Sequence, residues 1–283
     1  MKLHKDGAEI YVPDGKPLDE ALPRTTHMGI SAHQDDIEFM AYPGILESFH
    51  QPGKGFMGVV VTNGAGSPRA GVYADCSDED MQAIRKVEQK KAAFVGEYTA
   101  QALLMYSSSE VKDPGNADVV EDLRNILLAA KPEVVFTHNL ADKHDTHLCT
   151  ALRVIAAIRT LPKEDRPKKI YGGEVWRNLD WILDEDKVVF DVSDHENLAA
   201  AVMGVFDSQI SGGKRYDLAT MGRRRAHATY YASHGLDTAA SLAFCMDLTP
   251  LIEDDNLDIT GYIQGYIDRF ASEVSGRIDK FGK

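Results

Sequence analysis

Apolar residues along the chain fall into short compact runs that alternate with longer stretches of helical periodicity. Two early runs, 27–33 (HMGISAH) and 56–62 (FMGVVVT), are cut off by polar or turn-forming residues, which is typical of buried strands. An amphipathic helix is expected at about 80–95, followed by a third strand at 101–106. A short extended piece, 10–12, precedes all of these.

The next helix is delimited by its end signals. Asn116 is a suitable N-cap, apolar residues recur at helical spacing after it, and Pro132 marks its end. The alternation then continues, and we expect a strand at 133–138, a helix at about 147–160, strands near 170–176 and 187–192, and a helix begun by a capping box of Ser193 and Glu196.

Strand and helix alternate in this way from residue 27 to about 206, which predicts an α/β fold with a mostly parallel sheet. Because neither a low-complexity linker nor an internal repeat interrupts the pattern, we expect one domain over 1–283. Residues 1–25 form a polar lead-in. The tail from about 213 to 283 is expected to be a helical extension, packed on the sheet or engaged in a homo-oligomeric contact.

Composition narrows the function classes. The net charge of −13 gives no electrostatic footprint for nucleic acid or an anionic membrane surface, although a local basic pocket for an anionic substrate stays open. The three cysteines are far apart, which argues against a disulfide framework. Without an apolar segment of signal-peptide or membrane-spanning length, the chain is expected to be a cytoplasmic protein with no membrane span.

Polar side chains gather after two of the predicted strands. The first strand runs into residues 32–36 (AHQDD), and the strand at 133–138 opens into residues 138–147 (HNLADKHDTH). Functional groups in open α/β sheets collect at the carboxyl ends of the strands. We therefore expect these two segments to form one site.

The adjacent carboxylates of Asp35 and Asp36 would repel each other if they were buried without a partner, and a divalent cation would resolve this conflict. His33 and Asp36, three residues apart on a turn, can converge on one ion, and His147 supplies a third ligand. Two imidazoles and one carboxylate resemble catalytic zinc sites, which keep one position open for water. The pattern therefore predicts zinc as the cofactor, with Asp35 placed to take a proton from the activated water.

Three further features have two interpretations each. His144 lies one helical turn before His147 and can act as general acid or, as a cation, stabilise an oxyanion. Arg69 can bind a substrate hydroxyl or anionic group, or be a solvated loop arginine. The cluster 223–225 (RRR) lines an anionic subsite or forms a solvated helix face.

The two tryptophans also have two interpretations. Trp176 and Trp181 can each stack on a sugar ring or pack within the protein.

The two polar segments resemble the hallmark AHPDD and HPDH motifs of the PIG-L (LmbE-like) deacetylase family. The similarity covers most of the chain. Other matching stretches are VTNGAGS at 61–67, the helix residues Arg85, Glu88, Ala92, Ala93 and Gly96, PEVVFTHN at 132–139, and Asp207-Ser208-Gln209.

The resemblance implies a Rossmann-like three-layer sandwich and a set of roles. His33, Asp36 and His147 would bind zinc, Asp35 would be the general base, and His144 would assist charge stabilisation or leaving-group protonation. The implied reaction is hydrolysis of an N-acyl bond, typically the acetamide of an N-acetylglucosamine unit. The implied partner is therefore a small-molecule amino sugar. Free sugars, glycolipid head groups, thiol-cofactor precursors and antibiotic intermediates all stay open.

Two departures from the family pattern bear on the site. Gln34 replaces the usual Pro, which is expected to loosen the turn without removing a ligand. Thr146 replaces the Asp that normally precedes the final His, while Asp145 stands where Pro is usual. The missing carboxylate would orient neighbouring groups by hydrogen bonds, so its loss bears on the role of His144.

Other function classes leave few traces. The chain has no GxSxG elbow and no GxxxxGK[ST] loop, and the glycines after the second strand lack the third position of a dinucleotide fingerprint. A two-His-one-carboxylate set can also hold iron for oxygen chemistry. Thr146 keeps open a different class, a family member without turnover that acts as a ligand-binding protein.

Overall fold

The computed structural model describes residues 1–282, and within them eight strands form one sheet. The strands are β1 (Glu9–Tyr11), β2 (His27–Ser31), β3 (Phe56–Thr62), β4 (Ala100–Tyr106), β5 (Val134–His138), β6 (Lys169–Gly173), β7 (Lys187–Asp191) and β8 (Leu242–Asp247). Their order across the sheet is β1-β4-β3-β2-β5-β6-β8-β7. The five strands from β4 to β6 pair in parallel, whereas β1 pairs antiparallel with β4, and β8 pairs antiparallel with β6 and β7. The predicted α/β fold with a mostly parallel sheet is confirmed.

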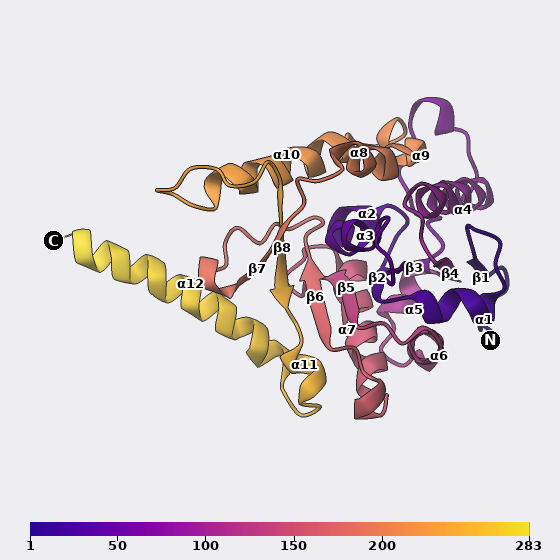
Figure 1. Ribbon diagram of the computed structural model, residues 1–283, viewed down its shortest axis with the longest axis horizontal. Helices are drawn as coiled ribbons and strands as arrows, with labels where there is room; N and C mark the ends of the chain where they lie inside the picture. Colours follow the sequence, from indigo (N-terminus) through magenta and orange to yellow (C-terminus); the bar gives the residue numbers. More distant parts are fainter. Residues whose placement is uncertain (283) are drawn as a thin grey trace.

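Helices cover both faces of the sheet and make a three-layer structure (Figure 1). The helices are α1 (Leu18–Ala21), α2 (Asp36–Met40), α3 (Tyr42–Ser48), α4 (Asp78–Val95), α5 (Ser108–Lys112), α6 (Ala117–Ala130), α7 (Asp145–Arg159), α8 (Glu196–Gly204), α9 (Asp207–Ile210), α10 (Tyr216–Tyr230), α11 (Pro250–Glu253) and α12 (Ile259–Phe281). In the view of Figure 1, α2, α3, α4, α8 and α10 lie above the sheet, and α6, α7 and α11 lie below it. Each face has its own apolar core.

The central strands are buried on both faces, as parallel strands between helical layers must be. Every residue of β2 and β3 is buried. Gly29 in β2 allows this close packing, because a Cβ there would lie 2.8 Å from the Phe56 ring and 3.0 Å from the Ala41 side chain. Ala41, which immediately precedes α3, and Phe56 of β3 thus pack directly against β2.

Two predicted helix starts have different outcomes. Asn116 does cap α6, since its side chain accepts a hydrogen bond from the Asp118 backbone N–H. The capping box of Ser193 and Glu196 is wrong: the Ser193 hydroxyl instead donates to Asp191 and accepts from the Ala240 backbone N–H. Ser193 therefore joins the end of β7 to the chain entering β8, and α8 begins at Glu196 without that cap.

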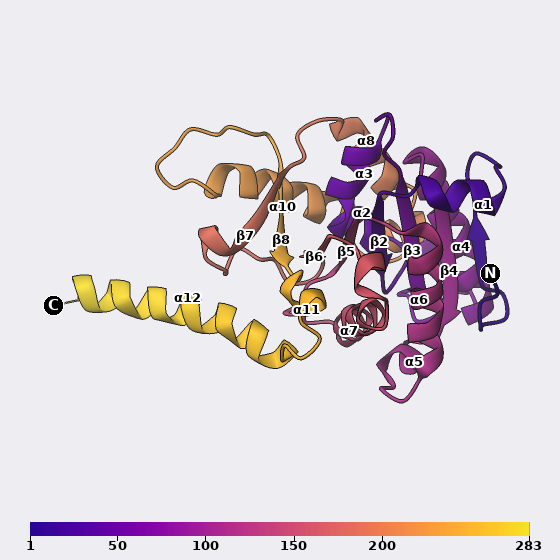
Figure 2. The same cartoon turned by 60° about the horizontal axis from the view of Figure 1, so that its bottom comes forward.

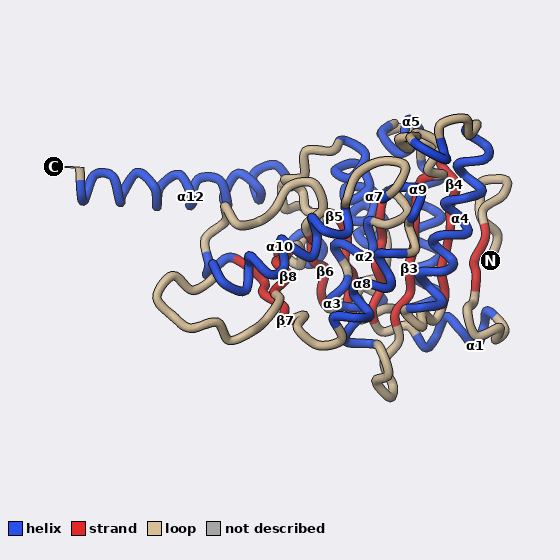
Figure 3. Tube along the Cα trace, turned by 90° about the horizontal axis from the view of Figure 1, so that it is seen from above, coloured by secondary structure: helices blue, strands red, loops and turns tan. Residues whose placement is uncertain are grey.

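The tail beyond residue 213 is not purely helical, which corrects the expected helical extension. Residues 242–247 form β8, inserted between β6 and β7 in the sheet. Beyond it, α12 projects from the body, so that the two termini lie at opposite ends of the long axis (Figures 1 and 2). Figure 3 shows the same projection from above. None of the helices within residues 1–282 combines the length and apolar character needed to cross a membrane.

Candidate active site

The strands β2 and β5 lie side by side and in parallel at the point where the strand order reverses. From β2 the chain proceeds to β3 and β4 on one side, and from β5 to β6 on the other. The loops that leave the carboxyl ends of two such strands diverge and open a crevice between them. Both polar segments singled out in the sequence begin at this crevice.

The loop after β2 is held tightly by backbone and side-chain contacts. Asp36 starts α2, and its Oδ2 accepts a hydrogen bond from the His33 backbone N–H at 2.8 Å. Gln34 is fully buried, and its Nε2 donates to the Thr62 carbonyl at 3.1 Å. The Gln34 side chain therefore ties the turn to the end of β3, where a looser turn was expected.

Asp35 sits in an unusual backbone conformation within this loop. Its φ is +95°, a region that costs a non-glycine residue roughly 1–3 kcal/mol and that surrounding contacts must enforce. One such contact is the Asp35 backbone N–H, which donates to Gln89 Oε1 at 3.3 Å. Gln89 in turn donates from Nε2 to Glu38 Oε1 at 2.9 Å. Gln89 and Glu38 are both fully buried, so helix α4, which carries Gln89, holds the Asp35 backbone in place.

The loop after β5 is organised by Asp142, which the sequence analysis did not single out. Its Oδ1 accepts a hydrogen bond from the His144 backbone N–H at 3.2 Å, and its Oδ2 accepts one from the Trp176 backbone N–H at 3.2 Å. The same Oδ2 lies 3.3 Å from His147 Nδ1. A carboxylate on the far nitrogen of an imidazole fixes its tautomer and orientation. Asp142 thus supplies the kind of support expected from the family carboxylate that Thr146 replaces.

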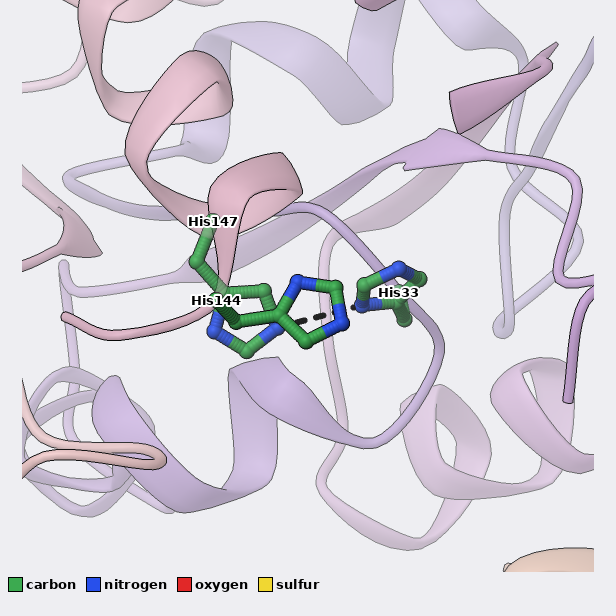
Figure 4. Close-up of side chains that lie close together, drawn as sticks. All are labelled: His33, His144 and His147. Atoms are coloured by element: carbon green, nitrogen blue, oxygen red, sulfur yellow. Dashed lines mark hydrogen bonds between the residues drawn. The ribbon is translucent and has the colours of Figure 1, made fainter. Parts of the chain in front are cut away.

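Three side-chain atoms from the two loops converge on one point. The distances are 3.2 Å from His33 Nδ1 to Asp36 Oδ2, 3.2 Å from His33 Nδ1 to His147 Nε2, and 3.3 Å from His147 Nε2 to Asp36 Oδ2. Figure 4 shows the rings of His33 and His147 meeting in this way, with the His144 ring beside them. The structure therefore brings together the three residues named in the sequence analysis as one ligand set.

His138 also reaches this cluster, with Nε2 3.5 Å from Asp36 Oδ2, and its ring stacks on His147. However, His138 Nε2 accepts a hydrogen bond from the Ala32 backbone N–H at 2.8 Å. Burial lowers the pKa of His138 well below its usual range, so the ring is neutral. With its lone pair engaged by the backbone, His138 serves to anchor the end of β2 against β5.

The charges in the cluster favour an ionised Asp36. Burial alone would raise the pKa of Asp36, but the neighbouring imidazoles of His147 and His33 outweigh it and hold that pKa well below its usual range. Burial alone would lower the pKa of His147, but the neighbouring carboxylates of Asp36 and Asp142 outweigh burial and raise that pKa above its usual value. An ionised carboxylate is the form that binds a cation.

Asp35 lies in a different environment from its neighbour. Burial raises the pKa of Asp35 well above its usual range, and the Arg85 guanidinium, with NH2 3.5 Å from Asp35 Oδ2, opposes this effect. Arg85 also donates to Ser67 and to the Gln34 carbonyl. Its role at Asp35 could not be assigned from the helix motif alone, because nothing in the motif shows which residue it faces.

His144 stands at the N-cap of α7 beside the converging atoms. Its ring stacks on His147 with the centroids 4.5 Å apart and meets His33 edge-on at 5.2 Å. Burial, and then the nearby His147, lower the pKa of His144. We call His33, Asp35, Asp36, His144 and His147 the strand-end cluster.

A cavity of about 600 Å³ opens above the strand-end cluster, and all five of its residues line it. Beside this cluster the cavity is also lined by Trp176 from the loop after β6, by Lys214 just before α10, and by Tyr216 and Arg223 of α10. We call these four residues the α10 wall. Trp176 lines the cavity, which is compatible with stacking on a ligand, whereas Trp181 packs edge-on against Phe270 of α12.

Of the two interpretations of Arg69, its contacts favour a place in the loop over binding of a substrate. Its guanidinium donates to the carbonyls of Cys76 and Ala65 and to Asp78 Oδ1. These contacts brace the loop after β3, and the guanidiniums that line the cavity are instead those of Arg85, Arg215 and Arg223. The sequence could not make this distinction, because loop contacts decide which arginine faces inward.

One family model matches part of the chain. Residues 28–158 match the family model described as GlcNAc-PI de-N-acetylase (PIG-L). These residues run from β2 to the end of α7, and they include every member of the strand-end cluster. No curated protein matches the chain.

Several solved structures share the fold. The 4-carboxy-2-hydroxymuconate hydratase of Pseudomonas putida is 13% identical, with a TM-score of 0.62 over 79% of this chain and 96% of that one. The N,N'-diacetylchitobiose deacetylase of Pyrococcus horikoshii is 18% identical, with a TM-score of 0.61 over 81% of this chain and 85% of that one. A deacetylase of the A40926 pseudoaglycone is 16% identical, with a TM-score of 0.56 over 79% and 97%. Since a hydratase and deacetylases share this architecture, the likeness shows the fold and leaves the reaction to the residues of the site.

Proposed function

We propose that the chain, whose residues 28–158 match the PIG-L family model, is a zinc-dependent hydrolase that removes an N-acyl group, acetyl in particular, from an amino sugar. The observation that carries the proposal is the triangle of His33 Nδ1, Asp36 Oδ2 and His147 Nε2 with edges of 3.2–3.3 Å. The deacetylase activities of similar structures agree with it.

The triangle fits a zinc ion in size and in chemistry. Ligand atoms at about 2.0–2.2 Å around a tetrahedral zinc lie about 3.3–3.6 Å from one another, close to the edges observed. Two imidazole nitrogens and one carboxylate oxygen are donors that zinc accepts. A zinc ion held there would act as a Lewis acid that lowers the pKa of water towards roughly 7 and polarises the amide carbonyl.

Asp35 is proposed as the general base. It lines the cavity directly beside Asp36, and its strained backbone is held in place by Gln89. From there its carboxylate takes the proton of the attacking water, while Arg85 keeps it oriented. Water adds to the amide carbon, the C–N bond breaks, and the products are a carboxylic acid and a free amine.

His144 is proposed to assist the same step from the other side. Its ring lies against His147 and lines the cavity, so it can hand a proton to the departing amine or stabilise charge on the carbonyl oxygen. Asp142 holds the backbone of His144 and the ring of His147 through its two oxygens. The replacement of the family Asp by Thr146 therefore leaves this support in place.

The direct test pairs elemental analysis with amine release from a panel of N-acetylated sugars, on the same sample. We expect about one zinc per chain and an amine release that the Asp35→Ala variant loses by at least about 100-fold while it retains the metal. The exposed Asp6 provides the matched control, Asp6→Ala, which should match the parent protein in both respects.

Two outcomes would contradict the proposal. One is zinc binding without amine release from any sugar, in the parent protein and in the Asp35→Ala variant alike. This outcome would favour a protein that binds a ligand without turnover. No zinc, and no activity after zinc is added, would overturn the hydrolase assignment.

A further inference from the structure

The charges that line the cavity are the reverse of those of the whole chain. The chain has 44 acidic residues and 31 basic ones. The cavity is lined by five basic side chains and two acidic ones, and both acidic ones belong to the strand-end cluster. Away from that cluster, the lining of the cavity is therefore cationic.

Two of the five cations are already neutralised by a neighbouring carboxylate. Arg85 lies beside Asp35, and Arg215 makes a two-pronged pair with Asp217 at 2.9 and 2.7 Å. Among residues 1–282, no carboxylate pairs with the other three, Lys112, Lys214 and Arg223. Three cations without a carboxylate partner around one cavity of an acid-rich protein favour the binding of an anionic ligand.

Two of these cations form one recognition surface with an aromatic ring. The Lys214 ammonium lies 4.9 Å from the centroid of the Trp176 ring. Arg223 donates from NH1 to the carbonyl of Val175, the residue that precedes Trp176. This bond brings the guanidinium to the loop that carries Trp176. The Trp176 ring is nearly parallel to that of His144, with the centroids 6.5 Å apart. The cationic surface thus adjoins the strand-end cluster.

From this arrangement we propose that the substrate carries an anionic group, a carboxylate or a phosphate, that binds Lys214 and Arg223 while the amide lies at the strand-end cluster. The aromatic faces of Trp176 and Tyr216 would contact the sugar ring between the two ends. The proposal rests on the proposed hydrolase function for the amide, and it adds the class of substrate. A cavity of about 600 Å³ has the volume of a small-molecule site, and the net charge of −13 disfavours a polyanion.

The kinetic test compares neutral and anionic substrates that share one acetamide. The panel is N-acetylglucosamine, its 1-phosphate and 6-phosphate, and N-acetylmuramic acid. The two esters test for a phosphate, and N-acetylmuramic acid tests for a carboxylate. At least one anionic compound should exceed N-acetylglucosamine in kcat/KM by about tenfold or more, since bonds to charged groups are strong. This advantage should shrink as salt is added, because exposed charges are screened.

A pair of matched lysine variants assigns the effect. Lys214→Gln should lower the ratio of anionic to neutral kcat/KM by about tenfold, and Arg223→Gln should do the same. Lys280 is a suitable control, because its ammonium also lies 4.9 Å from an aromatic centroid, that of Phe281, but on the projecting helix α12. Lys280→Gln should leave the ratio unchanged. A neutral sugar preferred over all three anions, or a ratio that Lys214→Gln does not move, would overturn the proposal.

A binding measurement separates this proposal from the hydrolase assignment. Tryptophan fluorescence is titrated with glucose 6-phosphate and with glucose, and a Trp176→Phe variant assigns the signal to the α10 wall. Binding of the phosphate ester that is at least about tenfold tighter, and that Lys214→Gln abolishes, would support the anionic subsite even if no sugar were deacetylated. Equal or absent binding of the two compounds would contradict the subsite whatever the enzyme hydrolyses.

Discussion

The strand-end cluster and the α10 wall are built in different ways. The strand-end cluster is anchored by backbone hydrogen bonds: Asp36 accepts from the His33 N–H, and Asp142 accepts from the His144 N–H. On the α10 wall, Lys214 is exposed, and Arg223 is joined to the neighbouring loop by a bond to the Val175 carbonyl. The strand-end cluster is positioned by the point between β2 and β5 where the strand order reverses. The α10 wall comes from segments that follow the parallel strands in the chain. On the proposed function, the topology thus places the site of bond cleavage, and the later segment is free to select the substrate.

This division has a kinetic consequence. A change in the strand-end cluster should lower the turnover of neutral and anionic substrates by the same factor, because it acts on the amide that they share. A change in the α10 wall should alter their ratio. Substitutions of His144, a member of the strand-end cluster, and of Asp142, which supports it, test this division.

The largest effect is expected at His144. His144→Gln removes the imidazole proposed to transfer a proton or stabilise charge but keeps a polar side chain, and we expect turnover to fall by about 100-fold or more for every substrate. Metal content should be unchanged, since His144 lies outside the triangle of ligand atoms. Steady-state kinetics on the panel, with metal content measured in parallel, checks both. A change in the ratio of anionic to neutral turnover would place His144 in substrate recognition instead.

A smaller effect is expected at Asp142, which contacts the proposed zinc ligand His147 but is not itself a proposed ligand. Asp142→Asn keeps the shape of the side chain but removes the negative charge beside His147 Nδ1. Such partners typically contribute about 10- to 100-fold in metal affinity, so zinc should bind more weakly by that factor in competition with a chelator. At saturating zinc the activity should largely return. An unchanged affinity would show that Asp142 organises the backbone alone.

Much of the fold could be predicted from the sequence, because local patterns decide it. Parallel strands buried on both faces form compact apolar runs, and the helices between them carry end signals such as Asn116. The strand β8 was missed because its residues 242–247 are an almost continuous apolar run, which has no period that separates strand from helix. Its pairing with β6 and β7, far away in the sequence, decides its structure.

The site shows the same limit. His33, Asp36 and His147 could be grouped from the sequence because each belongs to a polar segment that begins at the end of a predicted strand. Asp142 and Arg85 were left without a role because their importance depends on the atoms that they face, which only the folded chain defines. The side-chain type of Arg69 suits substrate binding as well as a place in a solvated loop, and in the structure contacts within its own loop engage it.

The position of the metal is the central claim and can be measured directly. Crystals grown with zinc would be examined by anomalous diffraction at the zinc absorption edge. We expect a single strong peak within about 2.0–2.2 Å of His33 Nδ1, Asp36 Oδ2 and His147 Nε2, absent in the Asp36→Ala variant. A peak held by His138, a peak that persists without the Asp36 carboxylate, or no peak at this crevice would contradict it.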